Sequence, residues 1–251
     1  MMKIKIDGLF YEGNEGETLL ELAKRNNINI PNLCHKKGFE GQGRCRLCMV
    51  EVTEKNKTKV VSSCVYPIKN GIEVHTNSEN ILRLRKNIIL LLLLKTPTNE
   101  YIKKLAEEYE VTAPERYINY RNIENCILCG LCVKACAKMG TSSISFVNRG
   151  TTKKVSTPYD DASKECIGCG ACAEVCPTKA IPISDEDGYR IIWNKKFQMI
   201  KCEICGKYYI TNESLEFINN KTGTEDEYEI CDSCKKKIIS DKFKESFKII
   251  I

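Results

Sequence analysis

The chain lacks the features of a membrane protein and of a secreted one. Its longest apolar run, residues 88–94, is seven residues long, whereas a membrane-spanning helix needs about 20. Residues 1–13 (MMKIKIDGLFYEG) contain no apolar segment of the kind that a signal peptide requires. We therefore expect no membrane partner and a cytoplasmic location.

The sequence also lacks the residue arrangements that perform catalysis. The chain has two histidines, and its sequence contains no nucleophile or acid–base constellation and no flavin fingerprint. The glycine-rich stretch at residues 38–43 (GFEGQG) is not a dinucleotide fingerprint, because no strand–turn–helix frame surrounds it. We therefore predict no catalytic residues and expect that the chain cannot accept a hydride by itself.

Cysteine, by contrast, is abundant. The sixteen cysteines all fall into four groups of four, each with the spacing of a metal site. Repeated Cys-x2-Cys pairs do not fit a secreted disulfide framework. The pattern predicts a protein that holds inorganic centres and whose folding is linked to their loading.

Two of the groups repeat the spacing Cys-x2-Cys-x2-Cys-x3-Cys. Three cysteines spaced in this way can enclose one corner of a [4Fe–4S] cube, and in two-cluster ferredoxins the fourth ligand comes from the other repeat. The repeat therefore predicts two [4Fe–4S] clusters. One is assigned to Cys126, Cys129, Cys132 and Cys176, and the other to Cys166, Cys169, Cys172 and Cys136.

The N-terminal group consists of Cys34, Cys45, Cys48 and Cys64. Four cysteines with a central Cys-x2-Cys pair, in a segment with β-grasp element order, predict one [2Fe–2S] cluster, although the spacing departs from the plant-type pattern. A structural zinc site is the alternative. A Rieske centre needs two histidine ligands and is not expected. His35 is interpreted as a loop histidine, with hydrogen bonding to the cluster as the alternative.

The last group, Cys202, Cys205, Cys231 and Cys234, is typical of two zinc knuckles that form one tetrahedral, structural Zn²⁺ site. Iron, in a rubredoxin-type site or a further cluster, is the alternative. No basic–aromatic surface accompanies this group, so no nucleic acid is expected. The formal net charge of +6 does not change this expectation. Each site with four thiolates around a 2+ centre has a net charge of about −2, so four such sites lower the total charge to roughly −2.

The element order predicts an α+β chain in four parts. These are a β-grasp [2Fe–2S] ferredoxin domain (residues 1–78), a helical spacer (79–118), a bacterial-type 2[4Fe–4S] ferredoxin domain (119–186) and a zinc-ribbon-like domain (187–251). In the first part, a helix is expected at residues 18–26 and strands at residues 3–6, 9–12, 49–52, 59–61 and 72–74.

Helices and short strands are expected in the other parts. The first spacer helix follows a capping signature, Thr76 to Glu79, and is stopped by Pro97. The second, at about residues 98–109, is expected to pack through Tyr101, Leu105 and Tyr109. Strands should follow the cysteine repeats at residues 143–147 and 180–183. A helix over residues 235–251 is expected to pack on its own domain through Ile238, Ile239, Phe243 and Phe247, with docking elsewhere as the alternative.

Four stretches resemble a known family: residues 43–52 (GRCRLCMVEV), 125–136 (NCILCGLCVKAC), 146–162 (FVNRGTTKKVSTPYDDA) and 166–181 (CIGCGACAEVCPTKAI). Through them, residues 1 to about 185 resemble the iron–sulfur half of the complex I large iron–sulfur subunit. They are more similar still to the electron-transfer half of the α subunit of iron-only and electron-bifurcating NAD-linked hydrogenases. The resemblance implies an electron relay between an NADH-binding flavoprotein subunit and a catalytic subunit or ferredoxin, with a small thioredoxin-like [2Fe–2S] subunit as a further partner.

The chain departs from this family in two ways. Residues 76–125 contain neither histidine nor cysteine, so the cluster with one histidine and three cysteine ligands is not expected. The C-terminal cysteine group stands where a hydrogenase or molybdopterin domain often follows, so hydrogen evolution and formate oxidation are not expected. The predicted function is an electron-relay subunit of an NAD(H)-linked oxidoreductase complex. A free-standing polyferredoxin shuttle and a metal-stabilised scaffold are the alternatives.

Overall fold

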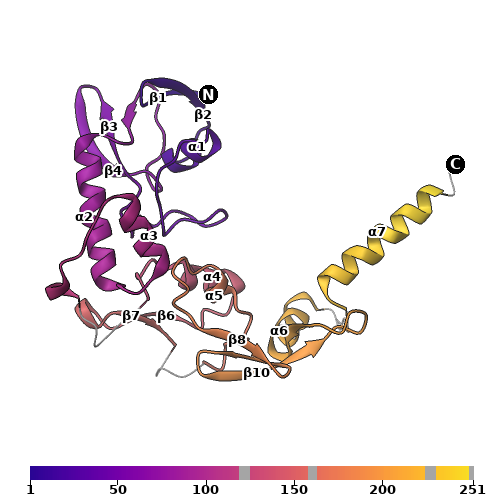
Figure 1. The fold of residues 1–251 in the computed structure, drawn as a ribbon. Coiled ribbons are helices and arrows are strands. Elements are labelled where there is room, and N and C mark those ends of the chain that lie inside the picture. Colours follow the sequence, from indigo (N-terminus) through magenta and orange to yellow (C-terminus); the bar gives the residue numbers. More distant parts are fainter. Residues whose placement is uncertain (119–124, 158–162, 224–229, 249–251) are drawn as a thin grey trace. The chain divides into compact units, whose positions relative to one another are not determined.

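The computed structural model describes residues 1–118, 125–157, 163–223 and 230–248 as a mixed α/β protein (Figure 1). The chain folds into two compact units. Unit 1 consists of Met1–Ala135, Phe146–Val155 and Val175–Ala180, and unit 2 of Cys136–Ser145, Ser156–Glu174 and Ile181–Ile251. Several boundaries between the two units fall within the cysteine repeat. Each unit therefore contains cysteines from both halves of that repeat.

The main sheet of unit 1 has five strands in the order β2-β1-β5-β3-β4. Their bounds are β1 Met2–Ile6, β2 Leu9–Gly13, β3 Met49–Glu54, β4 Lys57–Ser62 and β5 Glu73–His75. Strands β1 and β2 form an antiparallel hairpin that turns at Asp7 and Gly8, both with positive φ, as a two-residue type I′ turn requires. Strand β5 lies parallel to β1 and antiparallel to β3. The predicted strand positions are confirmed.

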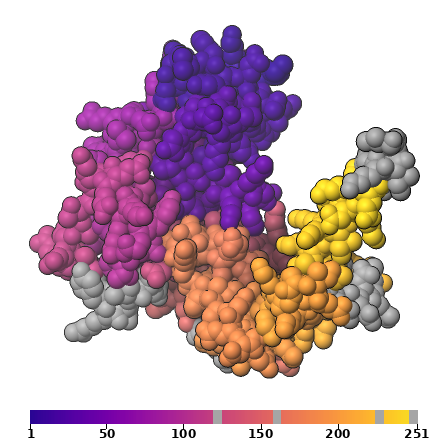
Figure 2. Space-filling view, turned by 45° about the vertical axis from the view of Figure 1, so that its right-hand side comes forward, coloured from indigo at the N-terminus to yellow at the C-terminus, as the bar shows by residue number. Residues whose placement is uncertain are grey.

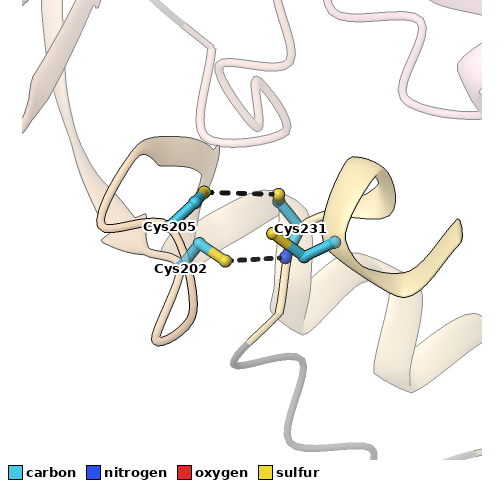
Figure 3. Close-up of side chains that lie close together, drawn as sticks. Cys202, Cys205 and Cys231 are labelled. Atoms are coloured by element: carbon cyan, nitrogen blue, oxygen red, sulfur yellow. Dashed lines mark hydrogen bonds between the residues drawn. The ribbon is translucent and has the colours of Figure 1, made fainter. Parts of the chain in front are cut away.

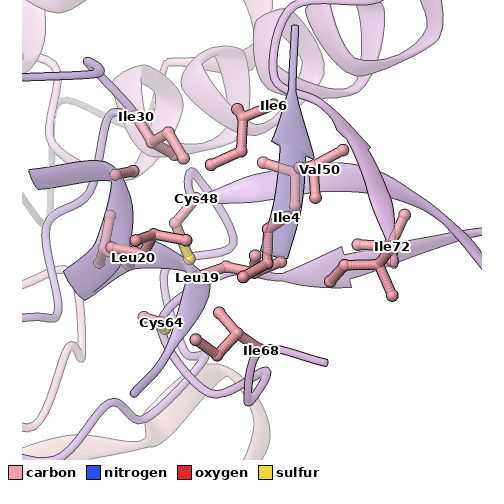
Figure 4. Packing of buried hydrophobic residues seen from close by; sticks show 14 residues of the cluster. Ile4, Ile6, Leu19, Leu20, Ile30, Cys48, Val50, Cys64, Ile68 and Ile72 are labelled. Carbon is pink, nitrogen blue, oxygen red and sulfur yellow. The ribbon is translucent and has the colours of Figure 1, made fainter. Parts of the chain in front are cut away.

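Helix α1 (Leu19–Arg25) confirms the predicted helix and contributes to the core of this domain. It begins at a capping box, in which the Thr18 hydroxyl accepts from the Glu21 N–H and the Glu21 carboxylate accepts from the Thr18 N–H. Four of its residues are buried against side chains of the sheet (Figure 4). Cys48 and Cys64 belong to this same buried cluster. Two of the predicted ligands are therefore positioned by the packing of the domain core.

Helix α2 (Glu79–Lys95) has a different N-cap from the predicted one. The Ser78 hydroxyl caps it by accepting from the Ile81 N–H at 3.3 Å. Thr76 instead donates to the Asp7 carboxylate, through its N–H at 2.8 Å and its hydroxyl at 2.5 Å. The capping role predicted for Thr76 is wrong, because a carboxylate that is distant in sequence takes both of its donors.

The apolar run of α2 is buried along only one edge. Ile89 is fully buried, whereas Leu91 is 67% exposed. The helix ends at Lys95, before Pro97, as predicted.

Helix α3 (Glu100–Glu108) begins at Asn99, whose side chain accepts from the Ile102 N–H. It buries Ile102, Leu105 and Ala106. Tyr101 is 51% exposed, so the packing predicted for this tyrosine is wrong, and Ile102 takes that place in the core.

The dicluster region contains short elements. Their bounds are η1 Glu115–Tyr117, α4 Leu131–Met139, β6 Ser145–Val147, η2 Gly150–Thr152, β7 Lys154–Ser156 and α5 Ala171–Glu174. Strands β6 and β7 form a two-stranded sheet, and β6 confirms the strand expected after the first cysteine repeat. The strand expected at residues 180–183 begins later, as β8 at Ile183.

Unit 2 contains a four-stranded antiparallel sheet in the order β11-β10-β9-β8. Its strands and the two helices that follow are β8 Ile183–Glu186, β9 Tyr189–Ile192, β10 Lys195–Lys201, β11 Tyr208–Thr211, α6 Asn212–Thr222 and α7 Asp232–Lys248. Helix α6 is capped by the Thr211 hydroxyl and ends at Gly223, whose φ of +65° lies in the left-handed region.

Helix α7 leaves much of its surface uncovered, as its yellow side chains show (Figure 2). Ile239 and Phe243 are each 65% exposed. The predicted packing on its own domain is therefore wrong for these two residues, while Ile238 is half-buried. The side chain of Phe247 lies outside the described residues. Over the described part of the chain, every helix is too short or too polar to cross a lipid bilayer.

A buried arginine connects α2 to a cysteine-bearing segment. Arg85 is 1% exposed. Its guanidinium donates hydrogen bonds of 3.0–3.2 Å to the carbonyl oxygens of Leu47, Met49 and Thr76 and to Oδ1 of Asn77. Leu47 and Met49 are the neighbours of Cys48, so Arg85 fixes the backbone that presents this cysteine. Buried carbonyl groups are costly when unpaired.

We expect Arg85→Met to lower the free energy of unfolding by about 2–4 kcal/mol, because it leaves buried carbonyl oxygens without donors. Thermal or denaturant unfolding of the anaerobically prepared, metal-loaded protein measures this loss. Arg83→Met, at an exposed position of the same helix, is the matched control and should cost less than about 0.5 kcal/mol. Equal stability of the two variants would contradict the role given to Arg85.

Candidate metal centres

The first cysteine set comprises Cys34, Cys45, Cys48 and Cys64, which are all buried. Cys34 follows α1, Cys45 and Cys48 precede β3, and Cys64 follows β4. Hydrogen bonds between the sulfurs connect Cys45 to Cys34, Cys34 to Cys64 and Cys64 to Cys48. The N–H groups of Leu33 and Cys45 donate to the sulfurs of Cys45 and Cys34, each at 3.4 Å. The four sulfurs thus form a chain of pairs with backbone donors around it.

The acidities within the first set show how its protons are shared. Hydrogen bonds from Cys45 and then Cys64 lower the pKa of Cys34 to about 2. A hydrogen bond from Cys64 lowers the pKa of Cys48 to about 6. The same hydrogen bonds, followed by burial, raise the pKa values of Cys45 and Cys64. The four sulfurs therefore share protons through their hydrogen bonds, and a bound metal centre would replace those protons.

His35 lies in the loop that contains Cys34. Its Nδ1 atom lies 3.0 Å from the ammonium nitrogen of Lys24. Burial, followed by the charge of Lys24, lowers the pKa of His35. The neutral imidazole therefore accepts a hydrogen bond from Lys24 through Nδ1.

The second cysteine set comprises Cys126, Cys129, Cys132 and Cys176, and all four belong to unit 1. Cys129 and Cys132 are buried, and the other two are half-buried. Burial, followed by the charges of the other three cysteine sulfurs, raises the pKa of Cys132 to about 12. The Ala180 N–H donates to the sulfur of Cys176 at 3.2 Å. The structure thus brings Cys176 to the three cysteines of the first repeat.

The first and second sets share one buried apolar cluster. Cys34, Cys45 and Cys129 lie in it together with Leu33, Leu47, Ile89, Ile102, Leu105, Ala106 and Leu131. Burial raises the pKa of Cys129 to about 11, and the charge of Cys34 is one of the further causes of the rise. The two sets are therefore close enough within unit 1 to interact electrostatically through low-dielectric surroundings.

The third cysteine set comprises Cys136, Cys166, Cys169 and Cys172, which all belong to unit 2. All four line one cavity. The sulfur of Cys136 accepts from the Ser143 N–H at 3.1 Å. Burial raises the pKa of Cys172 to about 11, and a hydrogen bond from the Trp193 side chain acts in the opposite direction. A cavity lined by four sulfurs suits a centre of several atoms.

The four sulfurs of the fourth cysteine set lie too close together to surround a centre of several atoms. Cys202 and Cys205 lie between β10 and β11, and Cys231 and Cys234 lie at the start of α7. Their four sulfurs lie within 4.8 Å of one another. The sulfurs of Cys205 and Cys231 are 3.8 Å apart, and the Cys231 N–H donates to the Cys202 sulfur at 3.3 Å (Figure 3). Four thiolates at about 2.3 Å from one ion are about 3.8 Å apart in a tetrahedron, so the spacing fits a single metal ion.

Backbone N–H groups stabilise the thiolate form in this fourth set. Hydrogen bonds from the N–H groups of Cys231 and Cys205 lower the pKa of Cys202 to about 6. The Gly206 N–H also donates to the carbonyl of Cys202, which closes a tight turn around the Cys-x2-Cys pair. A turn of this kind directs two sulfurs toward one point, as a zinc knuckle does.

Two protein-family models match the chain. Residues 1–79 match a 2Fe-2S iron-sulfur cluster binding domain, and residues 121–183 match a 4Fe-4S dicluster domain. The chain contains two iron–sulfur domains. The first set lies in the [2Fe–2S] domain, and the second and third sets lie in the dicluster domain. The fourth set lies beyond both matched ranges.

Three known proteins illustrate the resemblance. The chain is 31% identical over 212 residues to the NADP-reducing hydrogenase subunit HndD of Solidesulfovibrio fructosivorans, and the match covers 72% of this chain and 36% of the relative. It is 30% identical over 201 residues to the NADPH-Fe(3+) oxidoreductase subunit alpha of Geobacter sulfurreducens, covering 71% and 24%. It is 27% identical over 206 residues to an NADH-quinone oxidoreductase subunit of Rhizobium meliloti, covering 72% and 24%.

A solved structure agrees with these relatives. A chain of an NAD+-reducing [NiFe]-hydrogenase, solved in the H2-reduced state, superposes with a TM-score of 0.55 at 26% identity, covering 62% of this chain and 74% of that one. The present chain spans about a quarter to a third of the length of the three curated relatives. These matches confirm the resemblance that the sequence motifs indicated.

Two residues at these sites were not predicted. Arg85 interrupts an apolar i, i+4 series, since Ile81 and Ile89 are both fully buried. A charge at such a position is the signal that would have identified it. Trp193 is the only tryptophan in the chain and lies in a two-residue turn between β9 and β10. No spacing rule connects it to a distant cysteine.

Gly41 provides a test of the first set. A Cβ atom at this position would overlap the carbonyl group of Cys64, so we expect Gly41→Ala to displace Cys64 and to lose about two iron atoms per chain. Gly16→Ala is the control, because a Cβ there has nothing within 4 Å. The positive φ of Gly16 makes this control cost about 1–2 kcal/mol of stability. A Gly41→Ala protein with the iron content of the control would show that this contact does not position Cys64.

Proposed function

We propose that this chain is an electron-relay subunit of an NAD(P)-linked oxidoreductase complex. In this proposal the first set binds one [2Fe–2S] cluster, and the second and third sets each bind one [4Fe–4S] cluster. The observation that carries the proposal is the placement of sulfurs from the first and second sets in one buried apolar cluster. Electron transfer between protein-bound centres requires such short, dry separations.

The chain's own residues supply what a relay needs. Iron–sulfur clusters, when bound, accept and release single electrons at potentials set by net charge, hydrogen bonds to sulfur and solvent exposure. Here burial of Cys34, Cys48 and Cys129 excludes water from the ligands. Backbone N–H groups direct hydrogen bonds at several sulfurs. These donors stabilise the additional negative charge of a reduced centre, while burial keeps water away from it.

The fourth set is proposed to hold a structural Zn²⁺ ion in a zinc-ribbon-like arrangement. Four thiolates with tetrahedral spacing are the donor set that zinc uses in structural sites. The hairpin of β10 and β11 supplies two ligands and the start of α7 supplies the other two. Zinc has no redox chemistry at these potentials, so this site would stabilise the fold around β10. Iron in the same four-thiolate geometry is the alternative.

The partners follow from the chemistry and from the relatives. A hydride carries two electrons, so a flavin must divide it before single-electron centres can accept them. We propose that an NAD(P)H-oxidising flavoprotein subunit donates to this chain, with a small thioredoxin-like [2Fe–2S] subunit beside it. The acceptor would be a ferredoxin or a catalytic subunit. Electron bifurcation and a cytoplasmic location are part of the same proposal.

The relay proposal is tested by anaerobic purification of the tagged chain from its native host. We expect a flavin-containing subunit to co-purify, and we expect NADH or NADPH to bleach the visible iron–sulfur absorption of that complex. The chain alone is the control, since it has no flavin fingerprint and should be reduced by dithionite but not by either nucleotide.

Two outcomes would contradict the relay proposal. A chain that purifies as a monomer without flavoprotein, and that accepts electrons from several unrelated enzymes, would favour the free-standing shuttle. A chain that develops no electron paramagnetic resonance (EPR) signal after dithionite reduction would favour the scaffold.

A further inference from the structure

We propose that Trp193 closes the cavity of the third cysteine set and tunes the centre bound there by donating a hydrogen bond to Cys172. Trp193 lines the same cavity as Cys136, Cys166, Cys169 and Cys172. The inference rests on the proposed binding of a [4Fe–4S] cluster by the third set. It adds Trp193, which lies beyond the dicluster match ending at residue 183, to the surroundings of the third set.

The turn that carries Trp193 is unusual for such a large side chain. Ile192 pairs with Lys195, so Trp193 and Asn194 form a two-residue hairpin turn, with φ values of +54° and +59°. Turns of this type prefer asparagine and glycine, and a bulky residue with positive φ is strained. Backbone strain persists where the surroundings require it, and it commonly marks a functional position. Here the requirement is an indole ring directed into the cysteine cavity.

Contacts from the hairpin hold it against the cysteine loop. Arg190 of β9 donates to the carbonyl oxygens of Gly168 and Cys169, at 3.3 and 3.4 Å, and its pair with Asp185 at 2.7 Å fixes the guanidinium. Phe197 of β10 is fully buried. A Cβ atom on Gly168 would lie 2.6 Å from its ring, so only glycine permits this packing.

A third contact anchors the end of the same sheet. The hydroxyl groups of Thr211 and Ser214 both donate to the carbonyl oxygen of Ile167, at 2.6 and 2.9 Å. The backbone from Ile167 to Cys169 is therefore held by hydrogen bonds from β9 and from the start of α6, and by packing against β10. Trp193 is positioned by a rigid sheet, which is what a precise hydrogen bond to sulfur needs.

The indole has two consequences for a bound centre. Its N–H stabilises negative charge on the Cys172 sulfur, which favours the reduced form and raises the reduction potential. Its ring area excludes water and dissolved oxygen from one wall of the cavity. Trp193 is therefore a positioning and tuning residue.

The test is a redox titration of the full-length, metal-loaded protein, followed by EPR, for the wild type and Trp193→Phe. Phenylalanine keeps an aromatic ring but removes the N–H donor. At a fixed ambient potential, we expect the reduced-to-oxidised ratio of one [4Fe–4S] centre to fall about three- to tenfold, while the [2Fe–2S] centre and the other [4Fe–4S] centre keep their potentials.

A second variant guards against misfolding of Trp193→Phe. Because Trp193 is the only tryptophan, growth on the benzothiophene analogue of tryptophan replaces the N–H with sulfur at this position alone and preserves the ring shape. The same fall is expected. Tyr208→Phe, which removes a hydroxyl from the same sheet at a half-exposed position, is the matched control and should leave all potentials unchanged.

The outcomes separate this inference from the relay proposal. If the wild type shows two [4Fe–4S] signals and neither replacement shifts either of them, the role of Trp193 is wrong and the relay proposal stands. If the wild type shows no second [4Fe–4S] signal, the third set does not bind a [4Fe–4S] cluster. The role of Trp193 and the place of the third set in the relay are then both wrong.

Discussion

The structure depends on one electrostatic constraint: a thiolate removed from water needs positive charge or hydrogen-bond donors near it. Burial raises the pKa values of Cys129, Cys132 and Cys172 to about 11–12, so these thiols would keep their protons if no metal were bound. Metal binding removes that penalty, since it replaces the proton with a cation. Loading and folding are therefore linked in the second and third sets, and the raised pKa values of Cys45 and Cys64 extend the link to the first set.

The same constraint explains where rigid packing is found. Cys48 and Cys64 of the first set lie in the core of the five-stranded sheet, and Arg85 fixes the backbone on both sides of Cys48. In unit 2, strand β10 begins two residues after Trp193 and ends next to Cys202. One strand thus joins the wall of the third cysteine set to the fourth set. If both proposals hold, a zinc ion at the fourth set anchors one end of the hairpin whose Trp193 closes the cavity.

Local patterns in the sequence predicted much of this arrangement. The strands of the first domain, helix α1 and the end of α2 follow from alternation, helical periodicity and Pro97. The cysteine spacing also groups the sulfurs as the structure places them, including Cys176 with the first repeat and Cys136 with the second. The prediction for Thr76 was wrong because Asp7, which is distant in sequence, accepts hydrogen bonds from both of its donors. Trp193 was not predicted, because only the tertiary fold brings it to the cavity of the third set.

The most direct test of the account is the inorganic content of the full chain after anaerobic preparation. Iron, acid-labile sulfide and zinc are measured per chain, together with the EPR spin count after reduction. The account predicts about ten iron atoms, about ten sulfides and about one zinc, with spins from one [2Fe–2S] and two [4Fe–4S] centres. A colourless protein without labile sulfide, or one with iron near four per chain, would contradict it.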